Sequence, residues 1–246
     1  MEPTTGATER PARMLTNSNK DLARDGIWTF TLPALAAVLP DGRTIKTCPA
    51  AGKCAAICYA RSGSYTWANV KAAHVRNLAY IIEDPDGWQR AMTAELAHKR
   101  FLGKSVRVHD AGDYFSDDYT RRWLEIMRAT PGTFFYSYTK EVKRFRRLVE
   151  PDPPENFKWV YSLGGREDTL LDLGRDRTAD VFPDEESIAA AGHRSQAASD
   201  LLAVLGPAPV GMRANNIPRF RKRQGNRTLG QWQAEGDNRS PATPEN

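Results

Sequence analysis

Short runs of β-branched and aromatic residues alternate with helical patterns along most of the 246-residue chain. Helical spacing of apolar residues fills the intervals between these runs. Such alternation is typical of α/β proteins, in which parallel strands are joined by right-handed helical crossovers. We predict strands at residues 27–32, 105–109, 133–138, 157–163, 179–182 and 209–212.

The number of predicted strands limits the architecture. Six strands in a core of about 190 residues are too few for a complete eight-unit barrel, which typically needs about 250 residues. We therefore expect a partial or shortened TIM-like barrel of parallel strands with helical crossovers, and an open doubly wound sheet is the alternative. In either fold a functional site lies beyond the carboxyl ends of the strands.

One helix can be predicted in detail. Ser116 is a suitable N-cap, and Asp117 and Asp118 would lie in the positive first turn. Pro131 and Gly132 would stop this helix. Two further helices are indicated by apolar stripes that start at residues 70 and 88.

The composition allows a buried core, because 40% of the residues are hydrophobic and 26% are charged. The net charge is +5. We expect a flexible N-terminal arm at residues 1–24, a single α/β cluster-binding domain at 25–217 and a basic, disordered C-terminal tail at 218–246. The tail holds five cations with no acid between them: Arg219, Arg221, Lys222, Arg223 and Arg227.

The sequence pattern predicts neither a membrane-spanning helix nor a secretory signal. No apolar run approaches the roughly 18–20 residues that a membrane helix needs, and residues 1–19 lack the apolar stretch of a secretory signal. We therefore expect a soluble intracellular protein with no membrane partner.

The three cysteines, Cys48, Cys54 and Cys58, lie within eleven consecutive residues. An odd number in so short a span is not a disulfide framework. Pro49 and Gly52 bend the chain between the first two thiols, and one helical turn would place Cys54 and Cys58 on the same face. We therefore expect three thiolates to converge from one loop.

Soft thiolate ligands select iron–sulfur clusters, zinc or copper(I). Structural zinc usually takes four protein ligands with C-x2-C spacing, whereas this loop has C-x5-C-x3-C spacing and the chain has no fourth cysteine. A [4Fe–4S] cluster held by Cys48, Cys54 and Cys58 is therefore the preferred interpretation. Zinc with a His or Asp as fourth ligand is one alternative. The other is that the three cysteines bind no metal and are buried as small hydrophobic side chains.

A pocket is predicted at the end of the strand at 105–109. On a strand, Val106 and Val108 share one face while Arg107 and His109 share the other. His109 and the following Asp113 would then reach the carboxyl end, where a site is expected. The structural alternative is an edge strand with a solvated Arg and His.

The strand at 133–138 repeats this arrangement. Tyr136, Tyr138 and Lys140 would lie on one face, and their polar tips need partners if they are buried. Two glycines, Gly164 and Gly165, follow the strand at 157–163, and their amides could approach an anion. The candidate catalytic residues of the pocket are Arg107, His109, Asp113 and Lys140.

Nucleic acid is the partner suggested by the five cations of the tail, which could neutralise about five phosphates. A nuclease that binds a divalent ion through residues 109–113 is a related possibility, although few carboxylates are present there. The chain has no Walker-type phosphate loop and no G-x-G-x-x-G fingerprint, which disfavours nucleotide hydrolysis and dinucleotide binding.

Several of these segments together resemble the bacteriophage family called gene product eighty-eight. The resemblance covers roughly residues 17–183 and rests on residues 17–20, 47–60, 107–114 and 135–140. It implies a viral protein that acts in the host cytoplasm. The family name itself implies no reaction.

A weaker architectural similarity is to radical S-adenosylmethionine enzymes, which combine a partial barrel with a three-cysteine loop after the first strand. This similarity implies S-adenosylmethionine as a further cofactor. The chain departs from their pattern in its wider cysteine spacing and in lacking their glycine-rich acidic segment.

The preferred function is therefore a phage iron–sulfur protein, either a redox or radical-type enzyme or a regulatory cluster protein. The alternative is a nucleic-acid-binding protein or nuclease with a structural zinc or iron–sulfur site. A non-catalytic protein that binds a host or phage partner is a third possibility.

Overall fold

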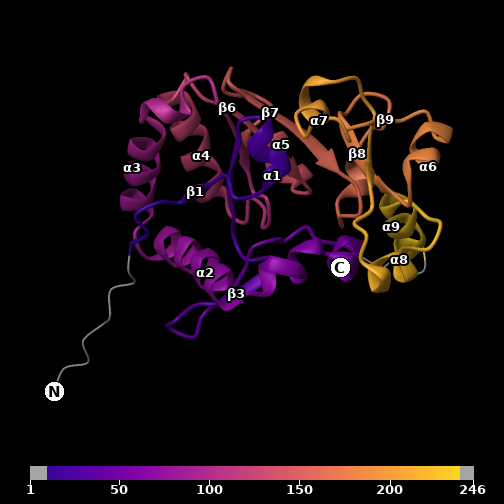
Figure 1. Cartoon of the computed structure of the whole chain (residues 1–246), viewed down its shortest axis with the longest axis horizontal. Helices are drawn as coiled ribbons and strands as arrows, with labels where there is room; N and C mark the ends of the chain where they lie inside the picture. Colours follow the sequence, from indigo (N-terminus) through magenta and orange to yellow (C-terminus); the bar gives the residue numbers. More distant parts are fainter. Residues whose placement is uncertain (1–9, 239–246) are drawn as a thin grey trace, which may run out of the picture. The chain divides into compact units, whose positions relative to one another are not determined.

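The computed structural model describes residues 10–238. It is an α/β protein in which most of the strand pairs are parallel (Figure 1). The described chain forms two compact units whose segments alternate along the sequence, in place of the single domain expected at 25–217. Unit 1 comprises residues 10–47, 60–135 and 153–157, and unit 2 comprises residues 48–59, 136–152 and 158–238.

Unit 1 contains a small sheet with helices α2, α3 and α4. Strands β2 and β5 pair in parallel, and the short β1 pairs with β2 antiparallel. A separate antiparallel hairpin is formed by β3 and β4. The elements are β1 (Leu15–Thr16), α1 (Lys20–Arg24), β2 (Ile27–Phe30), β3 (Ala36–Val38), β4 (Thr44–Lys46), η3 (Gly63–Thr66), α2 (Ala68–Glu83), α3 (Pro85–Leu96), η4 (Lys99–Phe101), β5 (Ser105–Val108) and α4 (Asp117–Ala129), where η denotes a 3-10 helix.

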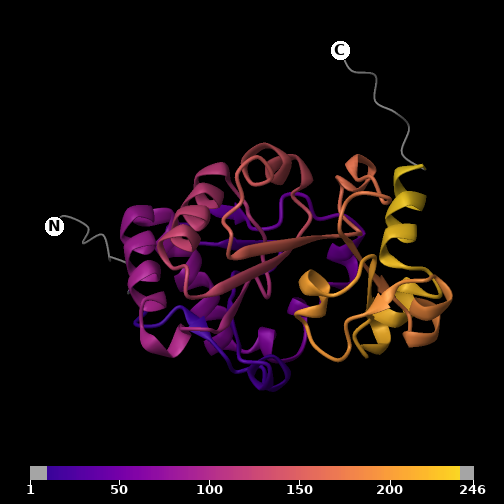
Figure 2. The ribbon, with the colours of Figure 1, turned by 90° about the horizontal axis from the view of Figure 1, so that it is seen from above.

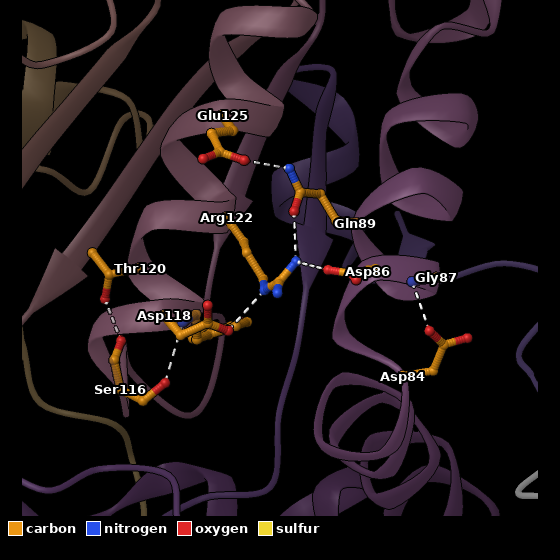
Figure 3. A network of polar contacts seen from close by, with 10 residues as sticks. Asp84, Asp86, Gly87, Gln89, Ser116, Asp118, Thr120, Arg122 and Glu125 are labelled. Atoms are coloured by element: carbon orange, nitrogen blue, oxygen red, sulfur yellow. Dashed lines mark hydrogen bonds and ion pairs between the residues drawn. The ribbon is translucent and has the colours of Figure 1, made fainter.

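Helix α4 begins where the sequence predicts it to begin. The Ser116 side chain accepts a hydrogen bond from the Tyr119 amide, and Asp117 and Asp118 occupy the first turn. Figure 3 shows that α4 is tied to α3 by Arg122, whose guanidinium contacts Asp118 and Asp86 at 2.7 Å each. These local signals explain why this helix is the best predicted element of the chain.

The core of unit 1 is aromatic. Phe30 packs edge-on against Trp123 at 5.3 Å between ring centroids, and Trp88 lies 5.5 Å from Trp123. All three rings are fully buried. These side chains come from β2, α3 and α4, so the helices cover the sheet face that carries Phe30.

The N-terminal segment is more ordered than expected for a flexible arm. Met14 and Leu15 are buried. Strand β1 pairs with β2, with Leu15 opposite Phe30. Asn19 caps α1 by accepting from the amides of Asp21 and Leu22. The expectation of an arm at 1–24 is therefore wrong for residues 14–24, and residues 1–9 lie outside the described chain.

Unit 2 holds most of β6 and a parallel set of strands in the order β7-β8-β10-β9. Neither unit shows its described strands closed into a barrel, so the partial barrel stays a prediction. Three elements run across the boundary of the two units, namely β6 (Phe134–Thr139), β7 (Phe157–Ser162) and the 3-10 turn η2 (Tyr59–Arg61). The other elements of unit 2 are η1 (Lys53–Ile57), α5 (Val142–Leu148), η5 (Asp168–Leu170), β8 (Thr178–Phe182), α6 (Glu185–Ala190), β9 (Arg194–Ser195), α7 (Leu202–Leu205), β10 (Val210–Arg213), α8 (Pro218–Gln224) and α9 (Leu229–Asp237).

The segment expected to be a disordered tail folds as α8 and α9 (Figure 2). Pro218 occupies the first turn of α8, a position that proline favours. Thr228 and Gln231 form a reciprocal capping box that starts α9. The expectation is therefore wrong for residues 218–237, and residues 239–246 lie outside the described chain.

None of the helices in the described range 10–238 is long and apolar enough to cross a bilayer.

Candidate functional site

The three cysteines lie in one loop of unit 2, which we call the cysteine loop (residues 48–58). Cys54 sits in η1, and Cys58 directly follows it in an extended conformation. All three side chains are half-buried, and none forms a disulfide. The thiols are therefore free of covalent cross-links and partly accessible.

The cysteine loop is held at the carboxyl ends of β6 and β7. The Ala50 amide donates to Oε1 of Glu141, which follows β6, at 2.8 Å. The Cys54 amide donates to the carbonyl of Gly164, which follows β7, at 3.1 Å, and the Arg166 amide donates to the Ala50 carbonyl. The loop thus occupies the edge of the sheet where α/β folds place their sites.

Helices α8 and α9 brace the cysteine loop as well. The Lys53 amide donates to Oε1 of Gln233 on α9 at 2.7 Å, and Nη1 of Arg223 on α8 donates to the Ala56 carbonyl at 3.1 Å. A Cβ at Gly52 would collide with the Gln233 side chain and the Gly164 carbonyl. The close approach of loop and helix therefore requires a glycine at position 52.

The three thiols are not gathered as a ligand set. Within residues 10–238, no three His, Cys, Asp or Glu side chains are placed so that they could hold a metal ion. The local reason is the helix type: η1 is a 3-10 turn. This turn ends at Ile57 and Cys58 follows it in an extended conformation, so Cys54 and Cys58 do not lie on one helical turn as the spacing predicted.

Lys140 closes the end of β7. Its ammonium group donates to the Ser162 carbonyl at 2.6 Å, to the Ser162 hydroxyl at 2.9 Å and to the Leu163 carbonyl at 2.8 Å. These contacts satisfy carbonyls at the strand end, so the structure gives Lys140 a bracing role beside the cysteine loop.

Tyr136 and Tyr138 share a partner, as their polar tips require. Their hydroxyls donate to the two carboxylate oxygens of Asp200 at 2.6 and 2.9 Å. Tyr136 is fully buried and Tyr138 is half-buried. Asp200 thus holds two neighbouring positions on one face of β6.

The two glycines after β7 bind an anion that belongs to the chain itself. The amides of Gly164 and Gly165 donate to the two carboxylate oxygens of Asp168 at 2.6 and 2.9 Å. Burial raises the pKa of Asp168 above its ordinary value. The predicted anion-binding amides are therefore filled by Asp168.

In unit 1, Arg107 faces a polar cluster at the end of β5. Its guanidinium lies 3.7 Å from the carboxylate of Asp110, and the Tyr65 hydroxyl donates to the same carboxylate. Asp113, three residues further along the chain, is buried. Its backbone amide donates to the Thr47 carbonyl at 2.7 Å.

His109 leaves the strand and turns into the aromatic core. Its φ of 68° is left-handed, and its ring lies 4.6 Å from Tyr114 and 6.3 Å from Phe30. Nε2 is 2.8 Å from the Tyr119 hydroxyl, whereas the buried Nδ1 has no hydrogen-bond partner. Burial lowers the pKa of His109 to about 3, so the imidazole is neutral.

The four predicted pocket residues are divided between the two units. Arg107, His109 and Asp113 belong to unit 1, and Lys140 belongs to unit 2. His109 follows the end of β5 with a left-handed φ, and its ring packs against Phe30, which pairs in register with Val108 and not with Arg107. The expectation that Arg107 and His109 share a face is therefore wrong.

The five basic residues of the segment that was predicted to be a tail are of two kinds. Arg227 is a structural residue: its guanidinium pairs with Glu235 at 2.6 Å and lies over the Trp232 ring. The other four are exposed on the surface of α8, namely Arg219, Arg221, Lys222 and Arg223.

Three residues that support the cysteine loop or β6 were not predicted: Glu141, Gln233 and Asp200. Glu141 carries a usable signal, because it is a charged residue three positions after the end of the predicted strand at 133–138. The other two are brought into place by elements distant in sequence, and nothing in their local pattern marks them.

The comparisons with known proteins identify a family. Neither the search of curated proteins nor the search of solved structures finds a match. The model of the family described as Gene product 88 matches residues 9–239, which extends the likeness seen from the sequence into α8 and α9. The chain therefore belongs to the Gene product 88 family.

Proposed function

We propose that the cysteine loop binds a [4Fe–4S] cluster, with Cys48, Cys54 and Cys58 as thiolate ligands, in a phage protein that acts in the host cytoplasm. The observation that carries this proposal is the concentration of three disulfide-free, partly exposed thiols in one loop. That loop is fixed at the carboxyl ends of β6 and β7. Three thiolates suffice to hold such a cluster through three of its four irons.

The proposal requires a local change in the cysteine loop, because the thiols are not grouped in this structure. Rewinding η1 from three to about 3.6 residues per turn would bring Cys54 and Cys58 to one face. The braces at Ala50, Lys53 and Ala56 would meanwhile keep the loop at the strand ends.

A bound cluster would supply electron transfer or an open iron for a small molecule, and its potential would depend on burial and on hydrogen bonds to its sulfurs. This chain's own residues would position the loop: Glu141 through the Ala50 amide and Gln233 through the Lys53 amide. A substrate bound at the open iron would make the protein an enzyme, and a cluster that only transfers electrons or responds to its surroundings would make it a regulator.

The test is anaerobic reconstitution of the full chain with ferrous iron and sulfide. The proposal predicts a brown protein with a broad visible absorption band, which Cys54→Ser lacks. The matched control is Ala55→Ser, which adds the same hydroxyl to the neighbouring residue of η1 and should keep the band. A colourless wild-type chain that instead holds stoichiometric zinc would reject the cluster in favour of a zinc site.

A second candidate function is nucleic-acid binding by α8. The observation that favours it is that Arg219, Arg221, Lys222 and Arg223 are exposed on an ordered helix. Each phosphate neutralised on duplex DNA lowers the slope of log K against log salt by about 0.9. Four cations would therefore give a slope of about −3.6.

Point variants test this function better than deletion, because α8 and α9 brace the cysteine loop. Arg221→Ala with Lys222→Ala should make the slope for duplex DNA less negative by about 1.8. The control pair, Lys143→Ala with Lys158→Ala, removes two exposed cations of unit 2 outside α8. Equal slopes for both pairs would remove α8 from consideration.

A further inference from the structure

A long stretch of the chain carries cations but no acids. Residues 42–82 contain six Lys and Arg residues and no Asp or Glu. Residues 42–47 and 60–82 of this stretch belong to unit 1, and residues 60–82 run through η3 and most of α2. The stretch itself therefore contributes only positive charge.

An exposed tryptophan stands in the middle of this stretch. Trp67 immediately precedes α2, and 62% of its surface is exposed. By contrast, Trp88 and Trp123 of the same unit are fully buried. The Trp67 ring is therefore accessible to a binding partner, whereas the rings of Trp88 and Trp123 belong to the core.

One cation and two neutral polar residues lie close to Trp67 in the chain. The Lys71 amide donates to the Trp67 carbonyl at 2.9 Å, so Lys71 lies one helical turn from Trp67. Lys71, Thr66 and Asn69 are exposed. Asp110 contacts this segment through Tyr65, and its carboxylate also faces Arg107.

We propose that Trp67 and the exposed groups around it form a stacking platform for single-stranded nucleic acid. Bases stack on an exposed aromatic ring without sequence preference, and neighbouring cations neutralise the backbone phosphates. This site is in unit 1 and is distinct from α8 and from the cysteine loop. It holds whether or not the chain carries a cluster.

The charge pattern favours nucleic acid over a protein partner. A protein interface usually gathers several apolar side chains around its aromatic anchors. Here the exposed neighbours of Trp67 are Ala68, Thr66, Asn69 and Lys71. An exposed aromatic ring beside a lysine and small polar residues fits a base and its phosphate better.

The test measures binding of the full chain to labelled oligo(dT) and oligo(U) of about 20 nucleotides by fluorescence anisotropy. Trp67→Ala should weaken binding about 5- to 150-fold, the range expected for the loss of one stacked base. Trp67→Phe, which keeps an aromatic face, should recover part of the loss. Lys71→Ala should make the slope of log K against log salt less negative by about 0.7.

The matched control is Leu102→Ala, which removes another exposed apolar side chain of unit 1, 72% exposed, and should leave binding unchanged. Circular dichroism of each variant checks that the fold is kept. Wild-type chain that fails to bind either oligonucleotide at low salt overturns the inference. Binding that Trp67→Ala leaves intact while Arg221→Ala with Lys222→Ala abolishes it also overturns it, and assigns the binding to α8 instead.

Discussion

The two units of the chain differ in how their buried polar groups are hydrogen-bonded. In unit 1, the buried Nδ1 of His109 and Nε1 of Trp88 have no hydrogen-bond partner. In unit 2, the buried acids have defined partners: Glu141 holds the Ala50 amide, and Asp180 holds the amides of Val181 and Gly230 at 2.7 and 2.9 Å. Unit 1 thus relies on aromatic packing, whereas unit 2 relies on polar braces that converge on the cysteine loop and the strands beside it.

The contrast suggests where each unit is sensitive. An aromatic core with a neutral buried imidazole should respond to protonation, because charging that group inside the core is unfavourable. A braced frame should respond to the loss of single carboxylates, because each removal leaves buried donors without acceptors. The predictions below test this difference in order of expected size.

The largest expected effect is the pH dependence that His109 gives to unit 1. Its pKa falls from 6.5 to about 3 on folding, so below pH 6.5 the unfolded chain takes up a proton that the folded chain does not. Stability from this group is fully present above pH 6.5 and falls by about 1.4 kcal/mol per pH unit as the pH drops toward 3. Urea unfolding between pH 4 and 7.5 measures it.

His109→Asn should flatten this pH profile, because asparagine accepts a left-handed backbone and does not titrate. The control is His98→Asn, an exposed histidine of the same unit, which should keep the wild-type profile. Identical profiles for wild type and His109→Asn would show that the imidazole is not held neutral by burial.

The next effect is expected at Glu141 in unit 2. Glu141→Ala removes the acceptor of the Ala50 amide and the ion-pair partner of Arg144. Breaking such a buried pair should lower the free energy of unfolding by about 3 kcal/mol. Chemical denaturation measures the loss, and Glu186→Ala on the exposed face of α6 should change stability by less than about 0.5 kcal/mol.

A smaller effect is expected at Asp200. Asp200→Ala leaves the hydroxyls of Tyr136 and Tyr138 without their shared acceptor, which should cost about 2 kcal/mol. Tyr138→Phe should cost less, because that ring is half-buried and the Tyr136 bond survives. If Tyr138→Phe proves more destabilising than Asp200→Ala, the shared-carboxylate description is wrong.

The smallest effect is expected at Arg122, the cation of the network between α3 and α4 in Figure 3. Its carboxylate partners are exposed, so Arg122→Met should cost only about 0.5–1 kcal/mol. High salt should reduce this difference, because it screens exposed ion pairs. Thermal unfolding compares it with Arg121→Met, an exposed neighbour, and a loss above that of Glu141→Ala would reverse the contrast between the units.

The sequence predicted elements whose signals are local. All six predicted strands correspond to β2, β5, β6, β7, β8 and β10 within two residues at either end. The cap of α4 at Ser116 is confirmed, as is the need of Tyr136 and Tyr138 for partners. Alternating patterns and capping residues suffice for such features because they depend on neighbours in the chain.

Features that depend on distant partners were not predictable. The charged segment at 218–227 has the composition of a tail, yet Phe220 and Leu229 are buried and anchor α8 and α9. His109 leaves its strand because its amide and that of Asp110 both donate to the Phe30 carbonyl on β2. In the cysteine loop, contacts from Gly164 and Gln233 accompany a 3-10 turn where the spacing alone suggested an α-helical one.

The central claim is that the cysteine loop of unit 2 holds an iron–sulfur cluster. Its most direct test is metal and acid-labile sulfide analysis of the full chain isolated without oxygen and without added iron. The account predicts about four iron and about four sulfide per chain, both lost in Cys54→Ser. A chain isolated in this way with neither iron nor sulfide, and with the same metal content in wild type and Cys54→Ser, would contradict it.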